Sequence, residues 1–223
     1  MPSVTVEDYL KQIYLEQQSA PGGLVSMGRL AEVMHVVPGT ATAMVKSLAE
    51  SGLVSYEPRS GVRLSRGGER LALGVVRRHR LVELFLVRTL GMDWSEVHDE
   101  AERLEHAISD KVLPAIDRTL GYPQFDPHGD PIPPAHGRPA ATSAGALVSL
   151  SDCRAGDQVR VSRIMDQDAA FLQFADRHGL TPGTTLTVDA NDTVADALTV
   201  RDGDGRSLTL GASAAGKIQV EPG

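Results

Sequence analysis

The stretch VHDEAERLEHAISD, residues 97–110, decides how the rest of the chain is interpreted. It contains no Pro or Gly and is rich in strong helix formers, so it predicts a helix. A core-facing stripe of such a helix should be apolar, because buried charges are costly unless they are paired or bind a metal. The side chains that instead share one stripe, at i, i+4, i+7 and i+8, are two imidazoles and two carboxylates: His98, Glu102, Glu105 and His106.

This stripe has two interpretations. Nitrogen and oxygen ligands without a thiolate suit Mn²⁺, Fe²⁺, Zn²⁺ or Co²⁺ better than a soft metal. The stripe is equally compatible with a solvated helix face that forms salt bridges with the nearby Arg103 and Lys111. Spacing alone leaves both interpretations open.

Composition is that of an ordinary globular protein, with 223 residues, 41% hydrophobic and 23% charged. The length suffices for two small domains or one large one. Cys153 is the only cysteine, so an intrachain disulfide is excluded. We find no apolar run that could span a bilayer and no signal peptide, and we therefore expect a cytoplasmic protein that does not associate with membranes.

The net charge of −7 is unevenly distributed. Residues 1–88 hold 11 Lys or Arg against 8 Asp or Glu, residues 89–140 hold 4 against 10, and residues 141–223 hold 7 against 11. We call residues 1–88 the basic head and the remainder the acidic body. This distribution predicts that the head binds phosphate groups and that the body binds cations.

The basic head has the pattern of a winged helix-turn-helix. A first helix is predicted at residues 5–18 with Thr5 as its N-cap, a second opens at Ser26, and a third spans residues 40–52. Two short strands around a Pro-Arg-Ser-Gly turn follow at residues 53–64. Any small α/β domain with a hairpin is the alternative, but the order of elements and the positive charge favour the winged helix.

Several side chains of this head suit DNA. Small residues at the start of the third helix allow close approach of the backbone, while Thr40, Thr42 and Lys46 can hold phosphate. In the wing, Arg59 and Arg63 are suited to phosphate contacts.

A long helix is predicted at residues 67–90, with Ser65 as its N-cap. His79 and Glu83 lie at i and i+4 on it, a pair that by itself is more often a surface contact than a ligand set. Beyond it we expect Trp94 and Val97 in the core, and a last helix at residues 109–120.

Residues 121–145 hold 6 of the 13 prolines and predict an extended tether, in which His128 and His136 should be exposed. The remainder, residues 146–223, shows five short alternating strands and one helix at residues 169–178, which predicts a small, partly open SH3-like barrel. Asp166 and Asp168 could reach a metal in the preceding domain.

Three motifs are specific: RRHRLVELFL (77–86), VHDEAERLEH (97–106) and HGDPIP (128–133). On these the chain resembles the diphtheria toxin repressor family of metal-dependent transcriptional regulators over almost its whole length. The resemblance implies a mainly α fold with small β parts. Its expected parts are a winged helix-turn-helix domain (1–66), a helical metal-binding and dimerisation domain (67–121), a Pro-rich tether (122–145) and an SH3-like domain (146–223).

The resemblance also implies two metal positions. The primary ligands would be Asp8, Glu102, Glu105 and His106. The ancillary ligands would be His79, Glu83 and His98, with Asp168 as the best candidate from the third domain. Phe171 stands where the iron-sensing branch has a Gln ligand.

The hard primary set of Asp8 and Glu102, as in the manganese-sensing branch, favours Mn²⁺. Fe²⁺ stays open, because Lys11 replaces a second carboxylate of that branch and the ancillary layout is that of the iron branch. Zn²⁺, Co²⁺ or Cd²⁺ can occupy such sites in vitro.

For DNA, the resemblance implies base contacts from Val37, Gly39 and Ala43 and phosphate contacts from Thr40, Thr42 and Arg59. It implies a homodimer on a palindromic operator of metal-uptake or metal-homeostasis genes, and no enzymatic activity. The alternatives are an Fe²⁺-responsive regulator, a carboxylate-bridged metalloenzyme, or an interaction protein with a solvated His/Glu stripe.

Overall fold

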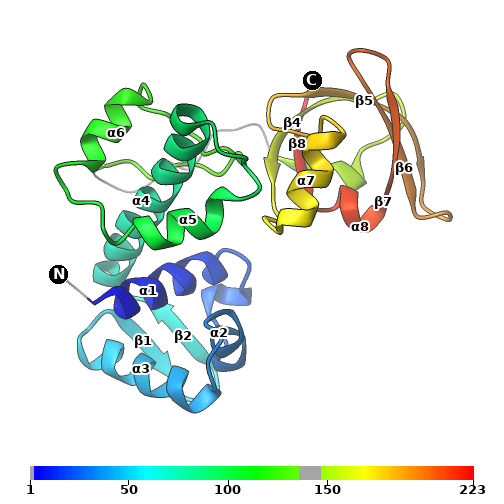
Figure 1. The fold of residues 1–223 in the computed structure, drawn as a ribbon. Helices are drawn as coiled ribbons and strands as arrows, with labels where there is room; N and C mark the ends of the chain where they lie inside the picture. The colour runs from blue at the N-terminus through cyan, green and yellow to red at the C-terminus, as the bar shows by residue number, and fades with distance from the viewer. Residues whose placement is uncertain (1–2, 136–146) are drawn as a thin grey trace. The chain divides into compact units, whose positions relative to one another are not determined.

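The computed structural model describes residues 3–135 and 147–223, which belong to two compact units (Figure 1). The first unit takes in residues 1–79 together with 105–108, and the second takes in residues 80–104 and 109–223. Helix α4 (Arg66–Leu90) begins in the first unit and ends in the second. Among the described helices, none combines the length and apolar character needed to cross a membrane.

The first unit contains three helices and a two-stranded hairpin before α4. The hairpin strands pair antiparallel, from Val54 opposite Leu64 to Glu57 opposite Gly61. This order of elements confirms the predicted winged helix-turn-helix. The elements are α1 (Val4–Gln17), a 3-10 turn (Pro21–Gly23), α2 (Met27–Val33), α3 (Pro38–Glu50), β1 (Val54–Glu57) and β2 (Gly61–Leu64).

Two helices begin earlier than predicted. Ser3 caps α1, because its Oγ accepts a hydrogen bond from the backbone N–H of Val6 at 3.4 Å, so the predicted cap Thr5 is wrong. Pro38 lies in the first turn of α3, where its fixed φ suits a helix start, and the helix therefore begins before Thr40.

The second unit continues with α5 (Val97–Leu104) and α6 (Leu113–Thr119). The predicted helix at residues 97–110 is therefore wrong beyond Leu104. Glu105, the next residue, is fully buried and forms an ion pair with Lys11. This tertiary contact outweighs the local helix propensity of the residues that follow.

Residues 147–223, which we call the third domain after the predicted division, contain one six-stranded sheet in the order β3-β8-β4-β5-β6-β7. All five predicted strands and the predicted helix are present. Strands β3 and β7 lie at the two edges, so the described strands form an open sheet and not a closed barrel. The elements are β3 (Val148–Ser149), a 3-10 turn (Leu150–Asp152), β4 (Gln158–Ile164), α7 (Ala169–Arg177), β5 (Thr185–Asp192), β6 (Ala197–Asp202), β7 (Ser207–Gly211), α8 (Ala212–Ala215) and β8 (Ile218–Pro222).

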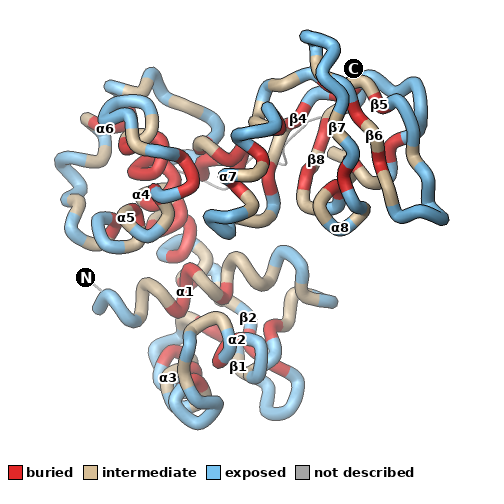
Figure 2. The backbone as a smooth tube through the Cα atoms, turned by 45° about the vertical axis from the view of Figure 1, so that its right-hand side comes forward, coloured by how far each residue is buried: buried red, intermediate tan, exposed pale blue. Residues whose placement is uncertain are grey.

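Each unit has its own apolar core, which lies among the buried residues that Figure 2 draws in red. Trp94, which precedes α5, packs in the same core as the strands of the third domain, and Val87 of α4 packs against that core. The expectation that Trp94 and Val97 are buried is therefore confirmed.

The described part of the Pro-rich segment is packed and not extended into solvent. His128 is fully buried, and Asp126, Asp130 and Ile132 are nearly so. The expectation that His128 is exposed is wrong, because the segment folds back on itself through a bridge between Phe125 and Pro131. His136 lies outside the described residues.

Candidate metal centre

Three of the predicted primary ligands meet in the first unit. Asp8 comes from the second turn of α1, while Glu105 and His106 follow the end of α5. His106 Nε2 lies 2.8 Å from Asp8 Oδ1 and 3.3 Å from Glu105 Oε1. These three ligand atoms lie within 4.8 Å of one another, a spacing at which one ion can contact all of them.

Two buried side chains hold the Glu105 carboxylate. Lys11 Nζ donates to Glu105 Oε1 at 2.7 Å, and His79 Nδ1 lies 2.6 Å from Glu105 Oε2. Lys11 is only 2% exposed and Glu105 is fully buried, so the pair is removed from solvent. These two contacts hold the carboxylate in one orientation beside His106.

Glu7 fixes the orientation of the His106 ring. Glu7 Oε2 lies 2.8 Å from His106 Nδ1 and accepts a hydrogen bond from Arg78 at 2.8 Å. Carboxylates on the outer nitrogen of a ligand histidine commonly set its tautomer, which leaves Nε2 for the metal. Sequence reasoning missed this role, and the only signal was that Glu7 precedes Asp8.

The fourth predicted primary ligand, Glu102, lies on α5 in the second unit. Its Oε1 is 3.8 Å from His98 Nε2, while His98 Nδ1 lies 3.2 Å from Glu83 Oε1. The structure therefore brings together Glu83 and His98 of the predicted ancillary set. The place of Glu102 in the primary set stays a prediction.

The remaining predicted ligands have other contacts. His79 directs Nδ1 toward Glu105, although it precedes Glu83 by one helical turn on α4. Asp168 is exposed and caps α7, where its Oδ1 accepts hydrogen bonds from the backbone N–H groups of Ala170 and Phe171. The roles of His79 and Asp168 as ancillary ligands stay predictions.

A buried cluster that sequence reasoning missed surrounds Glu83. Glu83, Asp126 and His128 offer ligand atoms within 4.8 Å of one another, and all three are buried. Asp126 and His128 belong to the segment that we expected to be a tether. The available signal was the HGDPIP motif itself, but its Pro-rich composition indicated exposure.

The His128 ring is oriented as a metal-binding imidazole. Its Nε2 lies 3.0 Å from the carbonyl oxygen of Trp94, which can only accept, so Nε2–H donates. The neutral ring then carries its lone pair on Nδ1, which lies 3.9 Å from Glu83 Oε2 and has no hydrogen-bond partner among the described residues. A backbone carbonyl on the other nitrogen is a common support of a ligand histidine.

Several carboxylates crowd this cluster. Burial raises the pKa of the Asp126 carboxyl well above its usual value, and the carboxylates of Asp130 and Glu83 raise it further. The Arg80 guanidinium lowers this pKa only in part. A divalent ion would relieve the repulsion between the carboxylates.

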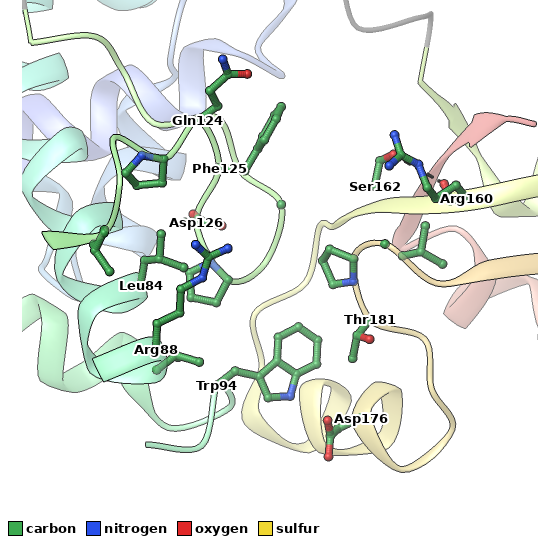
Figure 3. A pocket seen from close by; sticks show the side chains of 18 of the residues that line it. Leu84, Arg88, Trp94, Gln124, Phe125, Asp126, Arg160, Ser162, Asp176 and Thr181 are labelled. Carbon is green, nitrogen blue, oxygen red and sulfur yellow. Dashed lines mark hydrogen bonds between the residues drawn. The ribbon is translucent and has the colours of Figure 1, made fainter. Parts of the chain in front are cut away.

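A cavity of about 770 Å³ lies in the second unit (Figure 3). Trp94, Leu84 and Asp126 contribute to one part of its lining, and Arg160 and Ser162 of β4 to another. A metalloenzyme would need such a cavity to reach its metal. Of the cluster around Glu83, only Asp126 lines this cavity among the described residues.

The predicted DNA-contacting residues lie mainly on the exposed side of α3 and at the wing. Val37 is 68% exposed at the start of α3, and Arg59 at the wing turn has a positive φ of 71°. Thr42 is only half-buried, and its hydroxyl donates to the Pro38 carbonyl at 2.8 Å, so its donor is already engaged. The other predicted contacts are exposed: Gly39, Thr40, Ala43 and Lys46.

The chain matches three described protein domains over nearly its full length. Residues 1–62 match the iron dependent repressor N-terminal DNA binding domain, and residues 65–134 match the iron dependent repressor metal binding and dimerisation domain. Residues 148–222 match the FeoA domain. The second match includes the buried Asp126 and His128.

Similar proteins agree with these domains. The chain is 31% identical over 198 residues to the iron-dependent repressor IdeR of Mycobacterium leprae, covering 84% of each. A solved manganese-dependent transcriptional repressor in complex with manganese is 42% identical, with a TM-score of 0.86 and coverage of 97% of this chain and 99% of that one. The structure of ScaR with bound Cd²⁺ is 30% identical, with a TM-score of 0.78 and 99% coverage of both. The chain therefore belongs to the diphtheria toxin repressor family of metal-dependent, DNA-binding transcriptional repressors.

Proposed function

We propose that this chain is a homodimeric repressor that Mn²⁺ activates and that acts in the cytoplasm on palindromic operators of metal-uptake and metal-homeostasis genes. The observation that carries the choice of metal is the convergence of Asp8, Glu105 and His106. Completed by Glu102, this set has three carboxylates, one imidazole and no sulfur ligand. Such hard ligands remove any preference for softer ions and suit Mn²⁺.

Fe²⁺ is the second candidate. Iron-dependent repressors and a manganese-bound repressor are both similar to this chain. Oxygen and imidazole ligands also accept Fe²⁺, and Zn²⁺, Co²⁺ or Cd²⁺ would bind in vitro whatever the cell supplies.

A second metal position would use Glu83. In one arrangement, Glu83, His79 and His98 bind the metal together. Asp168 of the third domain would join them once it no longer caps α7. In the other arrangement, Glu83 joins Asp126 and His128. The second arrangement is supported by the complete burial of His128 and by its free Nδ1. We therefore favour it for the metal at Glu83.

Metal binding would act on the DNA-binding head through α1. Asp8 lies on α1, whereas Glu105 and His106 follow α5, so an ion held by all three fixes the head to the residues after α5. The ion then favours one arrangement of the head over others. By linkage, operator DNA should tighten metal binding by the same factor.

The exposed residues of α3 and the wing would hold DNA. Thr40, Lys46 and Arg59 suit phosphate, and Thr42 would add a contact as an acceptor through ordered solvent. At base edges, Val37 and Ala43 can contact thymine methyl groups, while Gly39 allows close approach.

Fluorescence anisotropy with promoter DNA from manganese- and iron-uptake genes tests the proposal. Binding would be measured with Mn²⁺, with anaerobic Fe²⁺ and with chelator, at one salt concentration. We expect tight binding only with Mn²⁺, and loss of it in His106→Ala. The exposed His178→Ala serves as the matched control. Tight binding with both metals would favour joint control, and binding that ignores metal would refute the switch.

A further inference from the structure

The loop that carries Asp126 and His128 is held from inside by Asp126. Its Oδ1 accepts hydrogen bonds from the backbone N–H groups of His128 and Asp130, both at 2.9 Å. Gly129 between them has a φ of +89°, which glycine adopts without strain. The turn therefore presents Asp126 Oδ2 and the His128 ring on a defined backbone.

The third domain holds the same loop from outside. The backbone N–H of Ile164 at the end of β4 donates to the His128 carbonyl at 2.9 Å. Gln167 Nε2 donates to Asp130 Oδ2 at 3.0 Å, and Arg163 forms an ion pair with Asp130 Oδ1.

The fit between loop and strand is close. A Cβ added to Gly129 would lie 1.9 Å from the carbonyl oxygen of Ser162 on β4, so no larger residue fits without displacement. From the other side, Arg80 of α4 donates to the carbonyl of Pro131 at 2.5 Å and lies 3.3 Å from Asp130 Oδ1. The loop is thus clamped between α4 and the third domain.

We propose that the third domain sets the affinity of the metal position at Glu83, Asp126 and His128 without supplying a ligand. Arg163 and Gln167 are positioning residues in this proposal, because they act on Asp130 and through it on the loop. The inference rests on the second metal position proposed above. It differs from a role for Asp168, which would require a ligand from the third domain.

The physical reason is the precision that a metal requires. His128 Nδ1 and Asp126 Oδ2 belong to a loop outside any helix or sheet, so their spacing depends on outside contacts as well as on the hydrogen bonds to Asp126 Oδ1. Loss of supporting contacts around metal ligands typically lowers affinity 10- to 100-fold. Arg163 and Gln167 both contact the Asp130 carboxylate. The loss of metal affinity on removing either side chain should therefore fall in this range.

The experiment measures Mn²⁺ and Co²⁺ binding to the full chain in a His106→Ala background, by calorimetry and by the Co²⁺ absorption spectrum. We expect Arg163→Gln and Gln167→Ala each to weaken binding by about 10-fold or more. Arg160→Gln is the matched control, because Arg160 is on the same strand but is exposed and pairs with Glu221 instead of with the loop. Its affinity should stay within twofold of the parent.

Three outcomes would overturn the proposal. Arg163→Gln and Gln167→Ala could both bind metal as tightly as the His106→Ala parent. Alternatively, Arg160→Gln could weaken metal binding equally, which would indicate a general effect on the fold. If His128→Ala left binding unchanged, the second metal position itself would be wrong. Metal-dependent DNA binding by the unmodified chain would still decide the proposed function separately. Gln167→Ala removes no charge, so it keeps the test valid if Arg163→Gln fails to fold.

Discussion

The ion pair between Lys11 and Glu105 should dominate the stability of the metal-free first unit. The two residues are 94 positions apart in sequence, and their charged atoms are 2.7 Å apart with side chains 3% and 0% exposed. Removal of either partner leaves a charge away from solvent with one fewer partner. Lys11→Met and Glu105→Gln are the variants that test this, since both nearly preserve side-chain volume.

The expected magnitude follows from distance and burial. At an effective dielectric constant of about 20, unit charges 2.7 Å apart attract by about 6 kcal/mol. Desolvation opposes much of this, and the loss of one partner of a buried pair costs about 3–5 kcal/mol. Lys11→Met should lower the free energy of unfolding by about 3 kcal/mol, because His79 still contacts Glu105 at 2.6 Å. Glu105→Gln should reduce the free energy of unfolding by nearer to about 5 kcal/mol, because the buried Lys11 ammonium then loses the carboxylate of its Glu105 ion pair.

Urea unfolding at pH 7 with chelator measures both variants. Far-UV circular dichroism follows the whole chain, while the fluorescence of Trp94, the only tryptophan, reports the second unit as an internal reference. The double variant should cost less than the sum of the single variants by about 2 kcal/mol. Exposed Lys111→Met is the control and should change stability by less than about 0.5 kcal/mol.

The reasoning would be refuted by either of two results. One is a loss below about 1 kcal/mol in both single variants, which is the range of an exposed pair. The other is strict additivity in the double variant, which would show that the two side chains do not interact.

Further predictions concern the metal, the DNA and pH. His106→Ala and Glu102→Ala should each abolish metal-dependent operator binding while circular dichroism shows an intact fold; an unchanged metal response in both would contradict the ligand assignment. Arg59→Ala should weaken binding to all DNA sequences alike and lower the slope of log affinity against log salt by about 1, and a sequence-specific loss would instead indicate a base contact. The hydrogen bond from Lys217 lowers the pKa of the Asp166 carboxyl below its ordinary 3.8. The ionised carboxylate therefore stabilises the folded state above pH 3.8, and this stabilisation is lost as the pH falls through the lowered pKa. Asp166→Asn should therefore cost under about 1 kcal/mol at pH 7, since the pair is about one-third exposed, and nothing in strong acid; a cost that persists there would point to packing.

The sequence by itself determined most of the fold, because its signals are local. Helix α4 and the hairpin of β1 and β2 lie where apolar spacing and turn residues predicted them. The five strands of the third domain likewise follow from alternation and glycine positions. Asp8, Glu105 and His106 were chosen by resemblance, and the structure brings them together.

Only the tertiary structure decided where α5 ends, how Glu105 is held and that His128 is buried. Periodicity reports which face of an element is apolar, but not which distant side chain meets a given carboxylate. The sequence marks Lys11 only as a departure from the manganese-sensing branch and predicts a tether around His128; neither signal indicates the partners that bury these residues. The physical reason is that long-range ion pairs and buried hydrogen bonds of a few kcal/mol outweigh the few tenths contributed by local propensity, so they override it at the metal centre.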